Sequence, residues 1–145
     1  MSRRRFTNYR KNTLKEHVTV IKESLYSELL ERIKEKSIVA IYFPTVLQGY
    51  SVDAQREQMS SLPEVLILSG PLDIAMAFAM YPDILGRDVD TPVYDCSAVN
   101  WASRKFSGNS LRFDVDARDG IAYFDHKEDL MAADGSSSGG LLYMG

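Results

Sequence analysis

Three short apolar runs constrain the fold of this chain most strongly: residues 38–43 (IVAIYF), 64–68 (EVLIL) and 91–96 (TPVYDC). A continuous apolar run bounded by turn residues is typical of a strand that is buried on both faces. Ser51 is a favourable N-cap for a helix over 52–59, and Pro71 suits the first turn of a mostly apolar helix over 72–81. This alternation of strands and helices predicts mainly parallel strands in one sheet.

The segments on either side of this alternating part follow different patterns. Residues 111–124 alternate apolar and polar side chains around a turn that contains Gly120, which predicts an antiparallel hairpin. A capping box at Thr13 and Glu16, followed by apolar residues at helical spacing, predicts a long helix over 13–35. The β-branched residues of HVTVI (17–21) leave a strand open as the alternative there.

We therefore expect an α/β or α+β fold with a single sheet. It would contain three mainly parallel buried strands and a C-terminal antiparallel hairpin, flanked by helices that include a long N-terminal one. The 145 residues, 45% of them hydrophobic, fit one domain with its own core. The expected divisions are a basic arm (1–12), a single α/β domain (13–132), and a Ser/Gly-rich flexible linker with an apolar tip (133–145).

Cysteine content and hydropathy indicate the cellular compartment in which the protein works. Cys96 is the only cysteine, so no internal disulfide can form, which is typical of a reducing compartment. No apolar run approaches the roughly 18 residues that span a bilayer, and we expect no membrane partner. The predicted localisation is cytoplasmic or otherwise intracellular, a virion included.

Charge is distributed unevenly along the chain. Residues 1–36 carry ten Lys/Arg and five Asp/Glu, a balance of +5, whereas residues 37–145 carry seven and fifteen, a balance of −8. Arginine and lysine interleaved with aromatic residues suit contacts with phosphates and bases, while a solubilising tail is the alternative. The candidate nucleic-acid or partner contacts in the arm are Arg3, Arg4, Arg5, Arg10 and Lys11.

The segment VAIYFPTVLQGYSVDAQREQM (39–59) resembles, in its outer parts, the start of the serine recombinase catalytic domain. Tyr42 and the residues from Gly49 to Gln55 carry the resemblance, which implies a strand that leads into the first helix of that domain. The places of the family's arginine and nucleophilic serine are taken by Pro44 and Val46. Phosphoryl transfer needs a hydroxyl nucleophile and cations, so we predict no recombinase activity and no catalytic residues.

Other short motifs lack the partners that their chemistry requires. His17 and Thr19 have the His-x-Thr form of two-histidine phosphoesterases, but the second histidine, His126, lies in DHKED. In DVDARDG (114–120) the glycine falls one position late for a calcium loop. The acidic residues of 125–129 alternate between strand faces or begin a solvated helix. We therefore predict no metal site and no cofactor.

The loops after the three predicted strands offer an alternative site. The carboxyl ends of parallel strands meet at one edge of a sheet, and helix N-termini there favour anions. The residues that would bind a phosphorylated ligand at this edge are Thr45, Ser69, Gly70, Asp95 and Ser97.

Two functions follow from these features. The first is a non-enzymatic structural or assembly protein, of the kind found in viral particles such as phages, that works as an oligomer or as part of a larger assembly. It would contact neighbouring subunits or nucleic acid through the basic arm and the apolar tip formed by Leu141, Leu142 and Tyr143. The alternative is a small α/β enzyme or binding module for a phosphorylated ligand.

Overall fold

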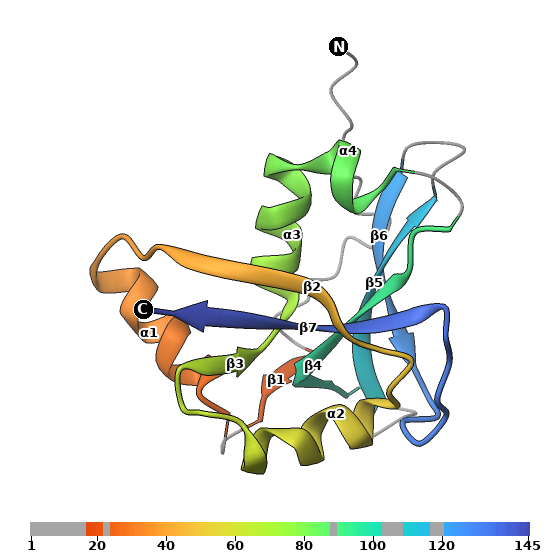
Figure 1. The fold of residues 1–145 in the computed structure, drawn as a ribbon, viewed down its shortest axis with the longest axis horizontal. Coiled ribbons are helices and arrows are strands. Elements are labelled where there is room, and N and C mark those ends of the chain that lie inside the picture. The colour runs from red at the N-terminus through yellow and green to blue at the C-terminus, as the bar shows by residue number, and fades with distance from the viewer. Residues whose placement is uncertain (1–16, 22–23, 88–89, 103–108, 117–120) are drawn as a thin grey trace.

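The computed structural model describes residues 17–21, 24–87, 90–102, 109–116 and 121–145. In this part of the chain, seven strands form one sheet in the order β2-β7-β4-β5-β6, with β1 paired to β4 and β3 paired to β7 (Figure 1). The strands are β1 (Val18–Val20), β2 (Ala40–Gln48), β3 (Leu66–Leu68), β4 (Val93–Trp101), β5 (Asn109–Asp116), β6 (Ile121–Lys127) and β7 (Ser137–Met144). The helices are α1 (Tyr26–Glu35), α2 (Val52–Gln58), α3 (Pro71–Met80) and α4 (Pro82–Leu85), with a 3-10 turn η2 (Met59–Ser61).

The sheet is mixed and mostly antiparallel, so the fold is α+β. Among the described strand pairs only β4 and β7 run parallel, and the prediction of three mainly parallel strands is wrong. The first predicted strand, 38–43, is also not buried on both faces, because β2 is an edge strand with exposed apolar side chains. The strand that organises the sheet is β7, which pairs with β2, β3 and β4.

The long N-terminal helix predicted over 13–35 is replaced by two elements. Val18, Thr19 and Val20 form β1, which pairs antiparallel with the end of β4. The helix α1 begins only at Tyr26. The β-branched side chains explain the difference, because they pack better on a pleated strand than along a helix. The predicted capping box at Thr13 and Glu16 lies outside the described residues.

Local signals elsewhere are confirmed. The Ser51 hydroxyl accepts a hydrogen bond of 3.2 Å from the Ala54 amide and caps α2. Pro71 occupies the first turn of α3. The hairpin predicted over 111–124 is the antiparallel pair β5–β6, in register from Ser110 opposite Lys127 to Asp116 opposite Ile121. These features depend on residues close in sequence, which is why the pattern was sufficient to predict them.

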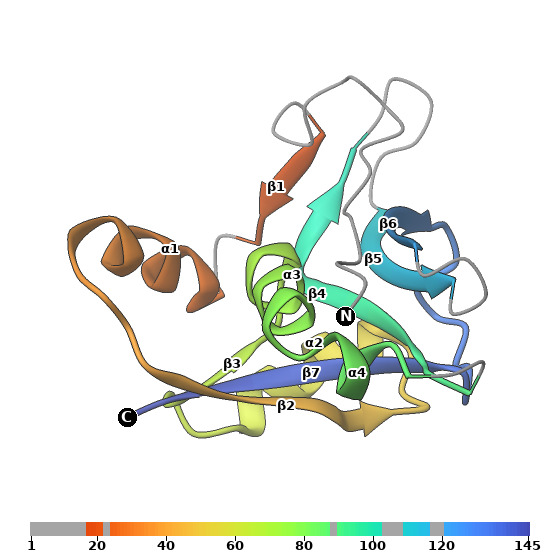
Figure 2. The ribbon, with the colours of Figure 1, turned by 90° about the horizontal axis from the view of Figure 1, so that it is seen from above.

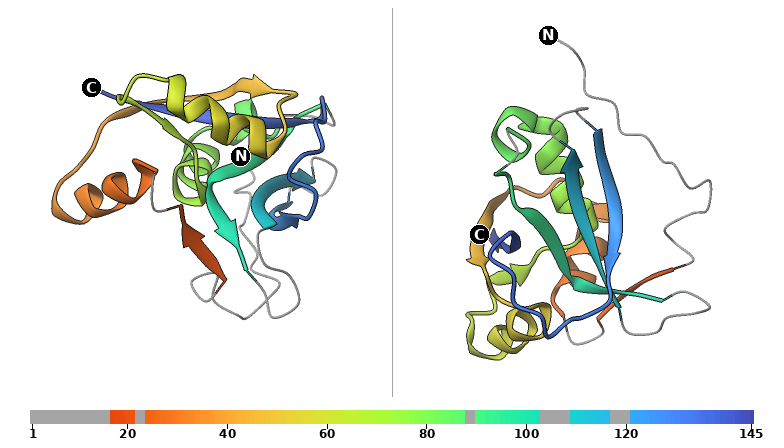
Figure 3. Two further views of the ribbon diagram at one scale, coloured as in Figure 1. Left: turned by 90° about the horizontal axis from the view of Figure 1, so that it is seen from below. Right: turned by 90° about the vertical axis from the view of Figure 1, so that its right-hand side faces the viewer.

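The two helices α2 and α3 cover opposite faces of the sheet (Figures 2 and 3). On the α3 face, Phe78 packs edge-on against Phe113 with ring centroids 5.3 Å apart, and Phe113 packs in the same way against Phe124 at 5.1 Å. Phe78 and Phe113 are both buried, and Ile74 lies one turn before Phe78 on α3. This apolar core fixes α3 on β4 and β5.

The predicted flexible linker over 133–140 is wrong in its second half. Ser137, Ser138, Gly139 and Gly140 are all buried and form the first half of β7. Small residues are needed there because both faces of β7 are approached closely. An added methyl group at Gly140 would lie 2.6 Å from Tyr42 Cε2, and one at Gly139 would overlap the Gln55 side-chain amide. The glycines therefore serve packing rather than flexibility.

Candidate functional site

The structure places the predicted contact residues of the two ends very differently. Arg3, Arg4, Arg5, Arg10 and Lys11 lie outside the described residues. Leu141 and Leu142 are each 4% exposed and belong to the core, because β7 lies inside the sheet. Tyr143 alone of the apolar tip is exposed, at 39%. The apolar tip is therefore no free segment that could dock into a partner.

The residues of the predicted phosphate-binding edge do not converge on one site. Ser69 and Gly70 lie at the start of α3, whereas Asp95 and Ser97 contact Gln55 of α2. The adjacent glycines of β7 show which face each group lies on. An added Cβ at Gly139 would meet Gln55, and one at Gly140 would meet Tyr42 and Ser69. Adjacent strand residues point to opposite faces, so the sheet lies between the groups. Thr45 is exposed on β2.

On the α2 face, a buried polar cluster joins α2 to β4. Gln55 Nε2 donates to Asp95 Oδ2 and to the Tyr50 carbonyl, each at 3.0 Å, and the Ser97 hydroxyl donates to Gln55 Oε1. Gln55 and Asp95 have no exposed surface. Arg56 adds a second link, because its guanidinium donates to the carbonyls of Ser97 and Val99. We call Gln55, Asp95 and Ser97 the Asp95 cluster.

Two cations lie near the buried carboxyl of this cluster. Burial raises the pKa of Asp95, and the charges of Lys127 and Arg112 together with the Gln55 hydrogen bond oppose that rise. Arg112 lies directly across from Asp95 on β5 and pairs with Asp125 at 3.3 Å. Asp95 Oδ1 and Lys127 Nζ are buried without a hydrogen-bond partner. The cluster anchors α2, and its complete burial gives a substrate no access to the carboxyl.

On the α3 face, a second polar cluster joins α1 to the start of α3. The Gly70 amide donates to Asp73 Oδ1 at 2.9 Å, and the Tyr26 hydroxyl donates to the same carboxyl while it accepts from the Leu72 amide. Asp73 Oδ2 has no partner. Burial raises the pKa of Asp73 to about 7, and the hydrogen bonds from Gly70 and Tyr26 limit the rise. We call Tyr26, Gly70 and Asp73 the Asp73 cluster.

The neighbours of Asp73 do not supply a nucleophile. The hydroxyls of Tyr42 and Ser69 lie beside each other and are buried without a well-formed hydrogen bond. Burial raises the pKa of the Cys96 thiol, and the nearby Asp73 and Asp95 carboxyls add to the effect. A reactive cysteine needs a lowered pKa, and Cys96 has no exposed surface. The Asp73 cluster is therefore a structural contact between helices.

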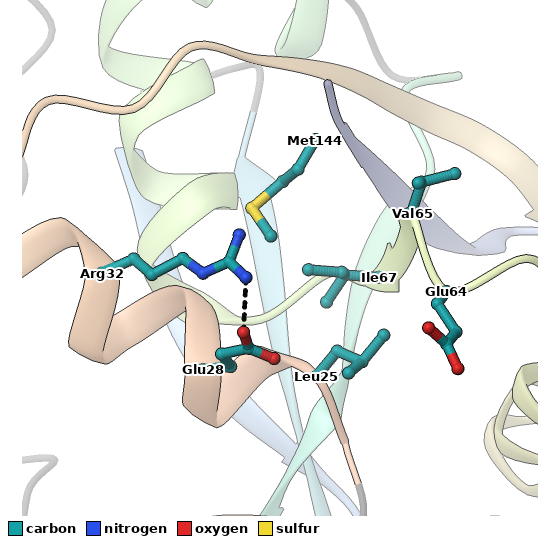
Figure 4. A pocket seen from close by; sticks show the side chains of 7 residues that line it. All are labelled: Leu25, Glu28, Arg32, Glu64, Val65, Ile67 and Met144. Atoms are coloured by element: carbon teal, nitrogen blue, oxygen red, sulfur yellow. Dashed lines mark hydrogen bonds and ion pairs between the residues drawn. The ribbon is translucent and has the colours of Figure 1, made fainter.

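A hollow of about 260 Å³ lies between α1 and the ends of β3 and β7 (Figure 4). Its floor is apolar and includes Leu25, Ile67 and Met144, and its rim carries an ion pair between Glu28 and Arg32. Both members of the pair are about half exposed, so it contributes little to stability. None of the residues that line the hollow is a buried acid, base or nucleophile.

A group of exposed apolar side chains lies on and beside the edge strand β2. Val39 is 89% exposed, Ile41 55%, Phe43 43% and Val46 54%. Ile41 lies directly opposite the exposed Tyr143 on β7, so the apolar surface continues across two strands. We call the side chains of Val39, Ile41, Phe43, Val46 and Tyr143 the β2 surface. Single exposed apolar residues are ordinary, but several of them along one sheet edge indicate a contact site.

The segment that resembles serine recombinases forms a strand-to-helix corner. Gly49 has a φ of 81° at the end of β2, and Ser51 caps α2. Pro44 and Val46 lie on β2, and Val46 points outward. Ser51 is buried and occupied in the cap, so its hydroxyl is not presented to a phosphate. The absence of recombinase activity stays a prediction that this geometry favours.

The two histidines lie on either side of Trp101. The ring centroid of His17 is 5.0 Å from that of Trp101, and the centroid of His126 is 6.5 Å from it. His126 also contacts Asp125 and Glu128. The two rings approach from opposite sides of β4, since His17 precedes β1 and His126 lies on β6 beyond β5. Across the described residues, no three His, Cys, Asp or Glu side chains are grouped as metal ligands.

Sequence reasoning missed Gln55, which hydrogen-bonds to Asp95 and Ser97, and Gly139, whose lack of a side chain leaves room for Gln55. A glutamine on the inner side of a short helix and a pair of glycines before an apolar run were the available signals. Both are common in loops as well. Only the pairing of β7 with β4 brings Gly139 next to Gln55.

Comparisons with known proteins give no relative for this chain. No family model, no curated protein and no solved structure matches it. In the described part of the chain, no helix has the length and apolar character needed to cross a bilayer.

Proposed function

We propose that the protein is a non-enzymatic assembly protein that contacts neighbouring subunits through the β2 surface. The observation that carries this proposal is the exposure of Val39, Ile41 and Phe43 along a sheet edge. A long apolar edge strand is a template for pairing with another chain, and natural proteins cover or charge such edges. An exposed apolar edge with no charge is therefore expected to be covered in the working protein.

The two terminal strands of the sheet order differ in this respect. The edge strand β6 carries Asp125 and Lys127 and is followed by Glu128, and charges of this kind prevent pairing with other strands. Residues 37–52, which include all of β2, contain no Asp, Glu, Lys or Arg. The contrast supports β2, rather than β6, as the edge that meets a partner in this proposal.

The basic N-terminal arm extends the proposal to nucleic acid or an acidic neighbour. Its five cations, Arg3 to Arg5, Arg10 and Lys11, suit phosphate contacts that do not depend on base sequence. A body that assembles through one surface and holds a polyanion through a basic arm fits a component of a viral particle. Binding through the arm should weaken steeply with salt, because each phosphate contact releases counterions.

The alternative, an enzyme or binding module for a phosphorylated ligand, has less support. Its residues divide between the two faces of the sheet, with Ser69 and Gly70 on one and Asp95 and Ser97 on the other. A phosphate cannot contact both groups at once. No observation on the described residues favours it over assembly.

A charge placed on the β2 surface should weaken the assembly. Ile41→Lys puts an ammonium group on a side chain that is 55% exposed, so the fold should tolerate it. Light scattering across a range of concentrations should show that the wild-type chain associates and that Ile41→Lys associates far less. Ile84→Lys, at a residue 72% exposed on α4, is the matched control and should behave as wild type.

Two outcomes would contradict the proposal. One is equal association of Ile41→Lys and wild type, which would place the contact elsewhere. The other is a chain that stays monomeric at every concentration, alone and with nucleic acid. Circular dichroism of each variant would establish that a lost association does not reflect a lost fold.

A further inference from the structure

We propose that the partner at the β2 surface is a second copy of this chain, paired antiparallel through β2 around a twofold axis within residues 39–43. This inference rests on the proposed function, because it names the occupant of the surface described there. The pairing would join the sheets of the two copies edge to edge. Three features of β2 support it: its charge, its backbone and the way the pairing closes.

The charge pattern permits a second copy and disfavours a charged partner strand. In a twofold antiparallel pair, each residue faces its own strand from the other copy, so a charged residue would face or neighbour a like charge. Residues 37–52 contain no charged side chain and so meet this requirement. An acidic or basic partner strand would find no counter-charge on β2. The exposed Ile41 and Phe43 would instead contact the same apolar side chains of the other copy.

The backbone restricts where the pairing can occur. Alternate residues of an edge strand direct their N–H and C=O groups outward. Pro44 has no N–H, and the register of β2 against β7 shifts between Phe43 and Leu47. The regular part that precedes Pro44 is therefore the segment able to pair, and its length is close to that of an ordinary strand of about 5–6 residues.

The pairing would close as a dimer. An isologous contact uses the same surface on both copies, so the dimer has no second β2 edge to offer. The opposite edge, β6, carries Asp125 and Lys127 and resists further pairing. Continued edge-to-edge growth into a filament is therefore not expected. Larger assemblies would use other surfaces of the dimer.

Single cysteine substitutions test this arrangement. Single cysteine variants at every position from 39 to 43 (V39C, A40C, I41C, Y42C and F43C) place a thiol at each possible position of the axis, and the native Cys96 is buried. Residues directly opposite in an antiparallel pair have Cβ atoms about 4.5–5.5 Å apart, within reach of a disulfide after small shifts. We expect one of these variants to form a covalent dimer on mild oxidation, most strongly at the residue nearest the axis. Ile84→Cys, on an exposed part of α4, is the control and should stay monomeric under denaturing electrophoresis.

The outcomes separate this inference from the proposed function. Efficient cross-linking within 39–43 and none at 84 supports the twofold pairing. Association by light scattering without cross-linking at any of the five positions overturns the inference and leaves the assembly function standing. Cross-linking at 84 as strong as that at 41 reflects random collision and also overturns it.

Discussion

Gly139→Ala should lower the free energy of unfolding by about 2–5 kcal/mol, a large effect for one added methyl group. The methyl group would overlap the side-chain amide of Gln55. Gln55 is fully buried and cannot move aside without breaking its hydrogen bonds to Asp95 and Ser97. A buried carboxyl and a buried hydroxyl would then lose their partners, and each such loss is costly.

Denaturant titration measures this effect, and Gly135→Ala is the matched control. An added methyl group at Gly135 meets no atom within 4 Å, so the control should stay within about 0.5 kcal/mol of wild type. The double variant Gln55→Ala/Gly139→Ala should be less destabilised than the sum of the single variants, because the overlap disappears. Equal stability of Gly139→Ala and wild type would mean that residues 137–140 are the flexible linker that their composition indicates.

The second large effect is a pH dependence that Asp73→Asn should remove. Asp73 has a pKa of about 7 in the folded protein and 3.8 as its ordinary value, because burial disfavours its charged form. A carboxyl with a raised pKa stabilises the fold fully below pH 3.8, and this contribution is lost as pH rises through about 7. The upper bound on the loss is about 4 kcal/mol.

Asparagine at this position is neutral at every pH and keeps an oxygen that can accept from the Gly70 amide. The variant should therefore match wild type at pH 4 and exceed its stability at pH 8, as measured by urea titration at each pH. Taking the difference between variant and wild type cancels the contribution of Asp95, whose pKa is also raised. Asp83→Asn, at an exposed residue on α4, should show no such divergence. A constant difference across this range would contradict the assigned role of Asp73.

The sequence predicted the elements whose signals are local. Ser51 before a run of helix formers, Pro71 after a turn, and alternating residues around Gly120 each specify a structure through neighbours in the chain. The mixed α+β class and the single sheet followed from these elements. The apolar runs predict a core that includes Ile67 and Phe78, and both are buried; the same reasoning places Ile41 in the core, and that prediction is wrong because Ile41 is 55% exposed.

The topology could not be predicted because β7 has the composition of a linker. Ser137 to Gly140 read as flexible chain, yet their small side chains admit Gln55 on one face and Tyr42 on the other. Without β7 as a strand, β2 and β3 have no partner and appear parallel to β4. The phosphate-binding edge was predicted for the same reason, because the ends of the strands before Ser69 and Asp95 meet at one edge only if those strands are parallel.

The N-terminal part shows a second limit. Residues 17–21 satisfy both a helical spacing and the β-branched composition of a strand. The choice is made by β4, whose end offers Val99 and Trp101 as partners for β1. Long-range pairing of this kind leaves no trace in a window of neighbouring residues.

The central claim is that another chain covers the outer edge of β2, and amide hydrogen exchange tests it most directly. Outward N–H groups of residues 39–43 exchange quickly in an isolated edge strand and slowly when hydrogen-bonded to a partner. We expect their protection to rise with protein concentration and to be lost in Ile41→Lys, while protection of the central strand β4 stays constant. Fast exchange of these amides at every concentration, in wild type and in Ile41→Lys alike, would contradict the claim.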